Sequence, residues 1–235
     1  MSTLDSPPHR SAGQRAGLSR ESVLIAARRI ADIEGVNRLT MRRLANELGV
    51  MPNALYSYFP HKEALLDALI DDLLGDIDSG DPNEGDWRDG LIKVMDSSRR
   101  LLLAHPQLVS IFLARPGLGR NAVRLGEITF TLLRRGGLDG DRAVEAFRIL
   151  LIYSLGFAAF QAPRLHGDSP ERTQQVESTF ANLAEDTYPD MRRLASQLAA
   201  PTTDRNYHTG LRWLLDGVSS GQADEDARKG SRLRS

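Results

Sequence analysis

Apolar residues recur every three or four positions along most of this chain, which is the spacing of one face of an α-helix. The first stripe follows Ser19 and ends at Gly35, a second ends at Gly49, and a third begins after Lys62. Further stripes predict helices at residues 87–104, 106–114, 120–135, 141–164, 171–186, 190–200 and 204–216. No strand pattern competes with these stripes, so the sequence predicts an all-α fold.

Polar segments divide these helices into regions. The clearest break is the stretch 76–86, which is rich in Asp and Gly. We predict a first helical domain at 19–75 and a larger helical domain at 87–217. The polar ends, 1–18 and 218–235, lack periodicity and are predicted to be a disordered arm and a disordered tail.

The segment that begins at Thr40 is typical of a helix, a tight turn and a second short helix. Thr40 can cap the first helix, and Gly49 can adopt the left-handed conformation that ends it. Pro52 suits the first turn of the second helix, while Leu55 and Phe59 lie four residues apart and can face a core. A helical hairpin inside a core is the alternative for this string alone. The flanking helices favour a helix-turn-helix that presents its second helix to a DNA major groove.

The side chains left for the outer surface of the second helix are small or polar. They are Asn53, Ala54, Tyr56, Ser57 and Tyr58. Such groups can form hydrogen bonds with base edges and phosphates, and Ala54 can touch a thymine methyl group. The segment is therefore a candidate DNA-reading surface.

The order of these motifs resembles the TetR family of bacterial one-component regulators over about residues 19–75. It rests on Leu-Thr-x-Arg-x-Leu-Ala-x-x-Leu-Gly-Val at 39–50, Ala-Leu-Tyr-x-Tyr-Phe at 54–59 and Lys-x-x-Leu-Leu at 62–66. A weaker resemblance to the tetracycline-repressor type of C-terminal domain rests on Trp87, Ala-Arg-Pro at 114–116 and Gly-Leu-Arg-Trp-Leu-Leu-Asp-Gly at 210–217.

The family resemblance implies which residues contact DNA: Thr40, Arg42, Arg43, Pro52, Asn53, Ala54, Tyr56, Ser57, Tyr58 and Lys62. Arg42 can donate two parallel hydrogen bonds to a guanine, or it is a phosphate clamp or a solvated side chain. Two positions depart from the family pattern, because Met51 replaces the usual Ser or Thr cap and His61 replaces a small polar residue. These departures leave the cap geometry open.

Composition and charge agree with a soluble DNA-binding protein. The net charge is −1, but residues 1–62 carry nine Arg and Lys against five Asp and Glu, and the remainder carries 21 against 26. A basic first part attracts phosphate, and an acidic remainder is repelled by it. The absence of Cys excludes disulfides and thiolate chemistry, and no apolar run reaches the length of a membrane span, so we expect a cytoplasmic protein. The arm at 1–18 either reaches a minor groove or is a leader without a role.

The larger domain resembles an effector-binding domain, which implies an interior pocket for a small apolar or aromatic molecule. Candidate lining residues are Met95, Arg99, Leu102, Phe112, Leu125, Thr129, Phe147, Leu151, Ser154 and Phe157, and ordinary core packing is the alternative for each. Arg99 either pairs with a core carboxylate or binds an anionic ligand. The resemblance places Ile111 where tetracycline-binding members use a histidine, which argues against a magnesium-bound drug. The histidines show no metal-ligand spacing, so no cofactor or metal is expected.

The helix at 141–164 is apolar on more than one face and needs more than one partner. Together with the last helix it can form a four-helix homodimer seam, and the resemblance implies the same two helices. The candidate interface residues are Leu155, Gly156, Ala159, Leu211, Trp213 and Leu214. The alternative is that both helices are interior core of a monomer.

Two short strings imitate enzyme motifs. Residues 217–221 fit G-x-S-x-G, and residues 117–122 fit a relaxed dinucleotide pattern, but neither follows a predicted strand, so an enzyme is not expected. The sequence instead predicts a homodimeric repressor that a small molecule releases from a palindromic operator. The alternatives are control by a protein partner, the absence of any effector, or activation in place of repression. The operator, the effector and the regulated genes lie outside what the chain encodes.

Overall fold

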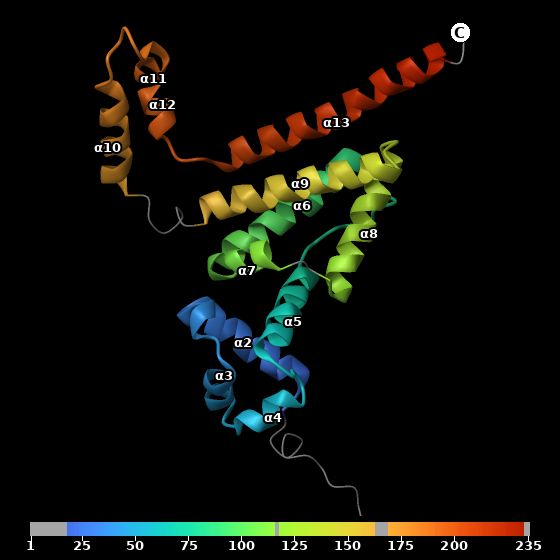
Figure 1. Cartoon of the computed structure of the whole chain (residues 1–235), viewed down its shortest axis with the longest axis vertical. Helices are drawn as coiled ribbons and strands as arrows, with labels where there is room; N and C mark the ends of the chain where they lie inside the picture. The colour runs from blue at the N-terminus through green and yellow to red at the C-terminus, as the bar shows by residue number, and fades with distance from the viewer. Residues whose placement is uncertain (1–17, 116–117, 163–168, 233–235) are drawn as a thin grey trace, which may run out of the picture. The chain divides into compact units, whose positions relative to one another are not determined.

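The structure, a computed structural model, describes residues 18–115, 118–162 and 169–232, with the backbone alone beyond Val218. Every regular element in these ranges is a helix, so the predicted all-α fold is confirmed (Figure 1). The predicted arm at 1–18 lies outside the described residues except for Leu18, which is buried.

The chain divides into two compact units. The first unit contains residues 1–77 and 104–127, and the second contains 78–103 and 128–235. Residues 104–127, which the sequence places in the larger domain, therefore pack with the first unit.

The first unit is built from short helices. They are α2 (Arg20–Glu34), η1 (Val36–Arg38), α3 (Met41–Leu48), α4 (Pro52–Tyr56), α5 (Lys62–Gly75), η2 (Pro106–Leu108), α7 (Val109–Ala114) and the start of α8 (Arg120–Arg135). Helix α2 starts with a capping box, in which the Ser19 and Ser22 side chains each accept a hydrogen bond from the other residue's backbone N–H. The core of this unit lies between α2, α3, α4 and α5, where Ala27, Leu44 and Leu69 are fully buried.

The second unit contains the longer helices. They are α6 (Trp87–Ala104), the end of α8, α9 (Gly140–Gln161), α10 (Pro170–Ala181), α11 (Pro189–Arg193), α12 (Ala195–Ala199) and α13 (Asp204–Arg232). The single helix predicted at 190–200 is two short helices, because the backbone leaves helical geometry at Leu194. Residues 217–221 lie inside α13, so the G-x-S-x-G string lacks the strand-to-helix turn that a catalytic serine requires.

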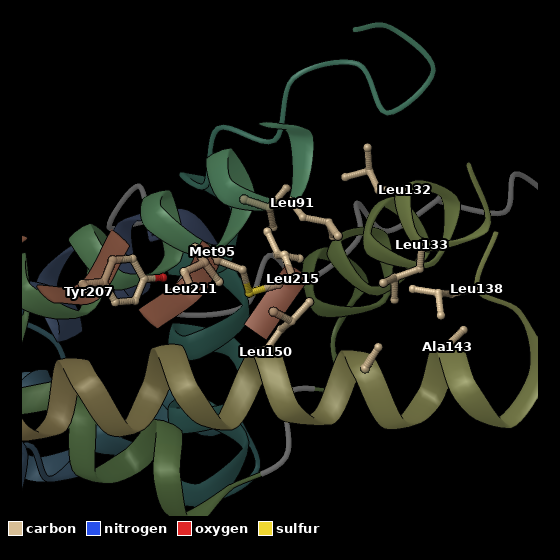
Figure 2. Packing of buried hydrophobic residues seen from close by; sticks show 12 residues of the cluster. Leu91, Met95, Leu132, Leu133, Leu138, Ala143, Leu150, Tyr207, Leu211 and Leu215 are labelled. Atoms are coloured by element: carbon tan, nitrogen blue, oxygen red, sulfur yellow. The ribbon is translucent and has the colours of Figure 1, made fainter. Parts of the chain in front are cut away.

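The core of the second unit joins α6, α8, α9 and α13. Figure 2 shows Leu91 and Met95 of α6 meeting Leu150 of α9 and Leu211 and Leu215 of α13. Leu211 was predicted at a dimer interface, but the structure corrects this, because the residue is completely buried within one chain. Leu211 therefore stabilises the fold of the second unit instead of contacting a second copy.

Helix α13 continues to Arg232, although the sequence predicted a disordered tail from residue 218. The segment is polar, which suggested disorder. It nevertheless contains no proline, and Ala223, Glu225, Ala227 and Arg228 are good helix formers that extend a helix already started.

Helix α9 has 22 residues, slightly fewer than the helix predicted at 141–164. It is the one helix in the described ranges that is long and apolar enough to cross a membrane by length and composition. Within one chain it packs against α13, and part of its apolar surface stays exposed at Ile149, Leu151, Ile152 and Phe160. Such an exposed apolar surface is a candidate contact surface.

Candidate nucleic-acid interface

The backbone of α3, the turn and α4 forms a helix-turn-helix. The Thr40 hydroxyl accepts a hydrogen bond from the Arg43 N–H at 3.0 Å and caps α3, as predicted. Gly49 has φ +65° and ends α3, which lets the Val50 N–H donate to the Ala45 carbonyl at 3.0 Å. The turn places α4 on the surface while Leu55 remains fully buried beneath it.

The outward face of α4 is polar and accessible. Asn53, Tyr56 and Ser57 are exposed, and Pro52 and Ala54 are half-buried beside them. The Tyr56 side chain is 47% exposed although it is a large aromatic group. An exposed tyrosine between small polar side chains is suited to contacts with phosphates and base edges.

Two of the candidate side chains on α4 and just after it already have partners in the free protein. The Tyr58 hydroxyl donates to the Leu18 carbonyl at 2.7 Å, and the Ser57 hydroxyl donates to the Ala54 carbonyl at 2.7 Å. Tyr58 thus attaches the end of the reading segment to the chain just before α2. Its ring edge is left for any contact with DNA, while its hydroxyl supports the fold.

The two neighbouring arginines of α3 differ in their surroundings. Arg43 donates to Glu34 at 2.5–3.2 Å and to Glu47 at 2.7 Å, and its guanidinium holds the pKa of Glu34 below the usual range. Arg42 is exposed and has no hydrogen bond or ion pair within the described part of the chain. Arg42 is therefore the better placed of the two for a base or phosphate, and Arg43 stabilises the packing of α3 against α2.

The start of α5 holds the last of the candidate DNA contacts. Lys62 is its first residue and is half-buried, and His61 caps the helix because its Nδ1 accepts from the Ala64 N–H at 3.1 Å. His61, which differs from the family pattern, therefore still caps its helix. Met51, which also differs, directly precedes α4 and makes no side-chain cap hydrogen bond.

Sequence reasoning missed Arg20 as part of this surface. Its guanidinium donates to the Tyr58 carbonyl at 3.1 Å and lies 4.3 Å from the centre of the Phe59 ring. The contact joins residues 38 positions apart, so no local pattern reveals it. Residues 18–62 carry seven Arg and Lys against four Asp and Glu, a net charge of +3 that favours DNA.

In the second unit, Arg99 forms the centre of a buried polar network. Its guanidinium donates to Gln161 Oε1 at 3.0 and 2.7 Å and to Asp204 Oδ1 at 2.5 Å, and it lies 4.6 Å from the centre of the Tyr207 ring. The Arg99 hydrogen bond lowers the pKa of Asp204. Of the two alternatives for Arg99, the structure supports pairing with carboxylates.

The remaining pocket candidates fall in both units. Met95, Leu102, Thr129 and Ser154 are buried in the second unit, where Phe147 and Phe157 are half-buried and Leu151 is exposed. Phe112 and Leu125 belong to the first unit. Tyr153 and Tyr207, which were not predicted to line a pocket, lie beside the candidate Ser154. The Tyr207 hydroxyl lies 2.9 Å from Ser154 Oγ, and Tyr153 stacks on Tyr207. The second unit is therefore rich in aromatic contacts.

The other interface candidates keep surface that a second chain can cover. Gly156 and Trp213 are exposed, and Leu155, Ala159 and Leu214 are half-buried. Trp213 and Leu214 line a groove of about 340 Å³ between α9 and α13, together with Ile149 and Val218. Ile149, Ile152 and Phe160, which were not among the predicted interface residues, are also exposed on α9.

Two family models together match most of the chain. Residues 23–69 match the model described as bacterial regulatory proteins, tetR family, and residues 79–221 match the tetracyclin repressor-like C-terminal domain. The second match alone covers more than half of the chain.

Similar individual proteins support the same family assignment. The chain is 34% identical to the HTH-type transcriptional repressor DrrR1 of Streptomyces coeruleorubidus, over 88% of this chain and 80% of that protein. Among solved structures, it is similar to the TetR family protein ActR of Streptomyces coelicolor in complex with actinorhodin, with a TM-score of 0.81, 30% identity and coverage of 87% and 98%. It is also similar to BioQ with its double-stranded DNA operator, with a TM-score of 0.61, 25% identity and coverage of 86% and 99%.

Proposed function

This chain belongs to the tetR family of bacterial regulatory proteins, and we propose that it is a homodimeric repressor that a small molecule releases from a palindromic operator. It is a DNA-binding transcriptional regulator by family. Its relatives are regulators and not enzymes, and we place it in the cytoplasm with the DNA it binds.

The observation that carries the proposal is the exposed face of α4. Tyr56 and Asn53 project from a helix whose inner side is fixed by the buried Leu55, and Arg42 lies exposed nearby on α3. Side chains held on rigid helices lose little freedom when they meet a base edge or a phosphate, so they suit a sequence-specific contact.

The palindrome follows from the proposed dimer. One short reading helix contacts few base pairs, whereas two on a dyad, about 34 Å apart, read two half-sites on the same side of the duplex. The exposed apolar residues of α9 and Trp213 of α13 supply the surface for this dimer. A second copy would cover the face of α9 that one chain leaves open.

We propose an effector that is apolar or aromatic. Arg99, the one candidate suited to an anionic ligand, is occupied by Asp204 and Gln161. Ile111 is buried and offers no ligand atom to a metal-bound drug. ActR, a structural relative, is seen with actinorhodin, which supports a ligand for this chain as well.

The first unit contains contacts suited to carry the effector signal to α5. Arg115 donates two hydrogen bonds to the Asp67 carboxylate, at 2.6 and 2.9 Å. One carboxylate oxygen of Asp71 accepts from the backbone N–H groups of Asn121 and Ala122 at 2.9 and 3.0 Å, at the start of α8. A displacement of Arg115 and the start of α8 would therefore move α5, and with it the reading segment that precedes α5.

The test is selection of genomic fragments by the purified protein at about 150 mM salt, followed by footprinting of the bound site. We expect a palindrome, and we expect Tyr56→Ala to lower specific affinity by a factor of about ten or more while the variant stays dimeric. Tyr188→Ala is the matched control, because Tyr188 is similarly exposed, at 50%, but lies in the second unit. Unchanged affinity of Tyr56→Ala would contradict the reading surface.

Release is tested on the same complex. A panel of apolar and aromatic compounds is added to the protein bound to its operator, and the fraction of bound DNA is measured. A compound that releases the operator supports the ligand-responsive repressor. Release by a protein fraction alone would favour control by a partner.

A further inference from the structure

Met51 is an exposed apolar side chain at the tip of the reading surface. It directly precedes α4 and is 77% exposed, more than any other large apolar side chain of α2 to α5. Keeping a thioether chain in water has no benefit for folding, because the removal of apolar surface from water is favourable. Ile33 on α2 is almost equally exposed, so it is the place of Met51 at the start of the reading helix, and not exposure alone, that suggests a contact with DNA.

The start of α4 is poorly suited to bind a phosphate. Pro52 has no backbone N–H, and the Ala54 N–H already donates to the Met51 carbonyl at 2.9 Å. The Met51 side chain makes no cap hydrogen bond and carries no strong donor. Met51, Pro52 and Ala54 therefore form an apolar tip where other helices offer N–H groups to an anion.

Thymine offers the matching group. Its C5 methyl is an apolar group that projects from a base edge into the major groove, where a reading helix lies. A methionine is long and flexible, so it can reach a neighbouring base and adapt to its methyl group. The polar side chains beyond this tip, Asn53 and Tyr56, are better suited to hydrogen bonds.

We propose that Met51 is a specificity-determining residue that selects thymine at one position of each operator half-site by covering its C5 methyl. The inference rests on the proposed function, since it requires that α4 reads an operator. It adds a base preference at a position where this chain departs from the family pattern, because the usual Ser or Thr would remove the apolar tip.

The experiment uses the full chain and the operator obtained by genomic selection. Each thymine of a half-site is replaced in turn by deoxyuridine, which lacks only the methyl group, and the dissociation constant is measured. We expect the wild-type protein to lose affinity about fourfold at one position, as burial of one methyl group requires.

Three variants test whether the loss of affinity at that position depends on the Met51 side chain. Met51→Ser should bind without the thymine preference at this position, and Met51→Leu should retain it because the side chain stays apolar. Ile33→Ala is the control for loss of an exposed apolar side chain, since Ile33 is 76% exposed on α2, away from the reading segment. All three changes are at the surface, and thermal unfolding measured beside each titration checks that the fold is kept.

The outcomes separate the two proposals. A bound operator whose deoxyuridine profile is flat, or is the same for wild type and Met51→Ser, overturns the inference about Met51 and leaves the regulator intact. Failure to select any operator overturns the proposed function and this inference together. A position at which the methyl effect is lost in Met51→Ser and kept in Met51→Leu establishes the role of Met51.

Discussion

Tyr207 is the buried side chain whose ionisation responds most clearly to the fold. It is fully buried in the second unit, and its hydroxyl lies 2.9 Å from Ser154 Oγ. Burial raises the pKa of Tyr207 to about 12, and the Ser154 hydrogen bond opposes this only in part. The folded protein therefore holds a neutral phenol at a pH where an unfolded chain, with a tyrosine pKa of about 10, has lost the proton.

The sign of the effect follows from the direction of this shift. A pKa that is higher in the folded state stabilises the protein fully below pH of about 10, and this contribution is lost as the pH rises toward about 12. We expect the free energy of unfolding to fall by roughly 2 kcal/mol across this window because of Tyr207 alone.

Tyr207→Phe should remove that slope. It should also cost about 1–3 kcal/mol at neutral pH, because the buried Ser154 hydroxyl loses its partner. Urea unfolding of both proteins at several values of pH measures the two effects, and Tyr188→Phe, at an exposed position, should change neither. A small slope should remain because burial also raises the pKa of Tyr153, but an undiminished slope in Tyr207→Phe would contradict the role of Tyr207.

The network around Arg99 shows what single residues do and do not reveal in a sequence. An arginine on an apolar helix face indicates either a carboxylate partner or a site for an anionic ligand, and in the structure Arg99 is buried and paired. Its partners Gln161 and Asp204 are 62 and 105 residues away. Side chains so distant come together only through the packing of α6, α9 and α13, so the sequence left the choice between carboxylate and ligand open.

At the scale of elements, Gly49 is the turn residue on which the reading segment depends. Its φ of +65° is the left-handed conformation, and a Cβ added there meets nothing within 4 Å. We expect Gly49→Ala to destabilise the first unit by about 1–2 kcal/mol through backbone strain alone, and to weaken operator binding because α4 is reoriented.

Gly85→Ala provides the matched control. Gly85 has φ +64° and equally open space, but it lies in the second unit between α5 and α6. It should suffer similar strain in thermal unfolding and leave operator affinity unchanged. Equal losses of affinity in the two variants would mean that general stability, and not the turn, sets binding.

Helices with a regular apolar stripe were predicted with their boundaries. The ranges 87–104 and 120–135 coincide with α6 and α8, since continuous periodicity marks where burial begins and ends. The polar end of α13 was missed, because a stripe is the wrong signal for a helix that extends from a packed segment into a polar one. The turn after α3 was predicted because glycine chemistry is local, whereas the pairing of Arg43 with Glu34 depends on how α2 and α3 pack.

At the scale of the molecule, the sequence placed the two domains in order but missed which residues pack together. Residues 104–127 follow α6 in the chain and join the first unit in space. The hydrogen bond of His105 with Asp32, at 2.8 Å, and the ion pair of Arg115 with Asp67 form within this unit. Neither pair carries a sequence signature, so these contacts within the first unit became visible only in the structure.

The proposed dimer is the property of the whole molecule on which the proposed recognition of a palindrome depends. Trp213 is 73% exposed on α13 and lines the groove of about 340 Å³ with Ile149 of α9. If a second copy fills this region, Trp213→Glu buries an unpaired charge in the seam and should yield a monomer at micromolar concentration in analytical ultracentrifugation.

The same variant separates assembly from reading. Each monomer keeps an intact α4, so single half-sites should bind with unchanged affinity, while affinity for the full palindrome should fall by a factor of 10²–10⁴ because the second half-site is no longer held nearby. Ile25→Glu places the same charge on an exposed apolar residue of α2 and should stay dimeric. A Trp213→Glu protein that remains a dimer and binds the palindrome at full strength would place the seam elsewhere on the molecule. Loss of half-site binding as well would instead show that the first unit depends on assembly for its own fold.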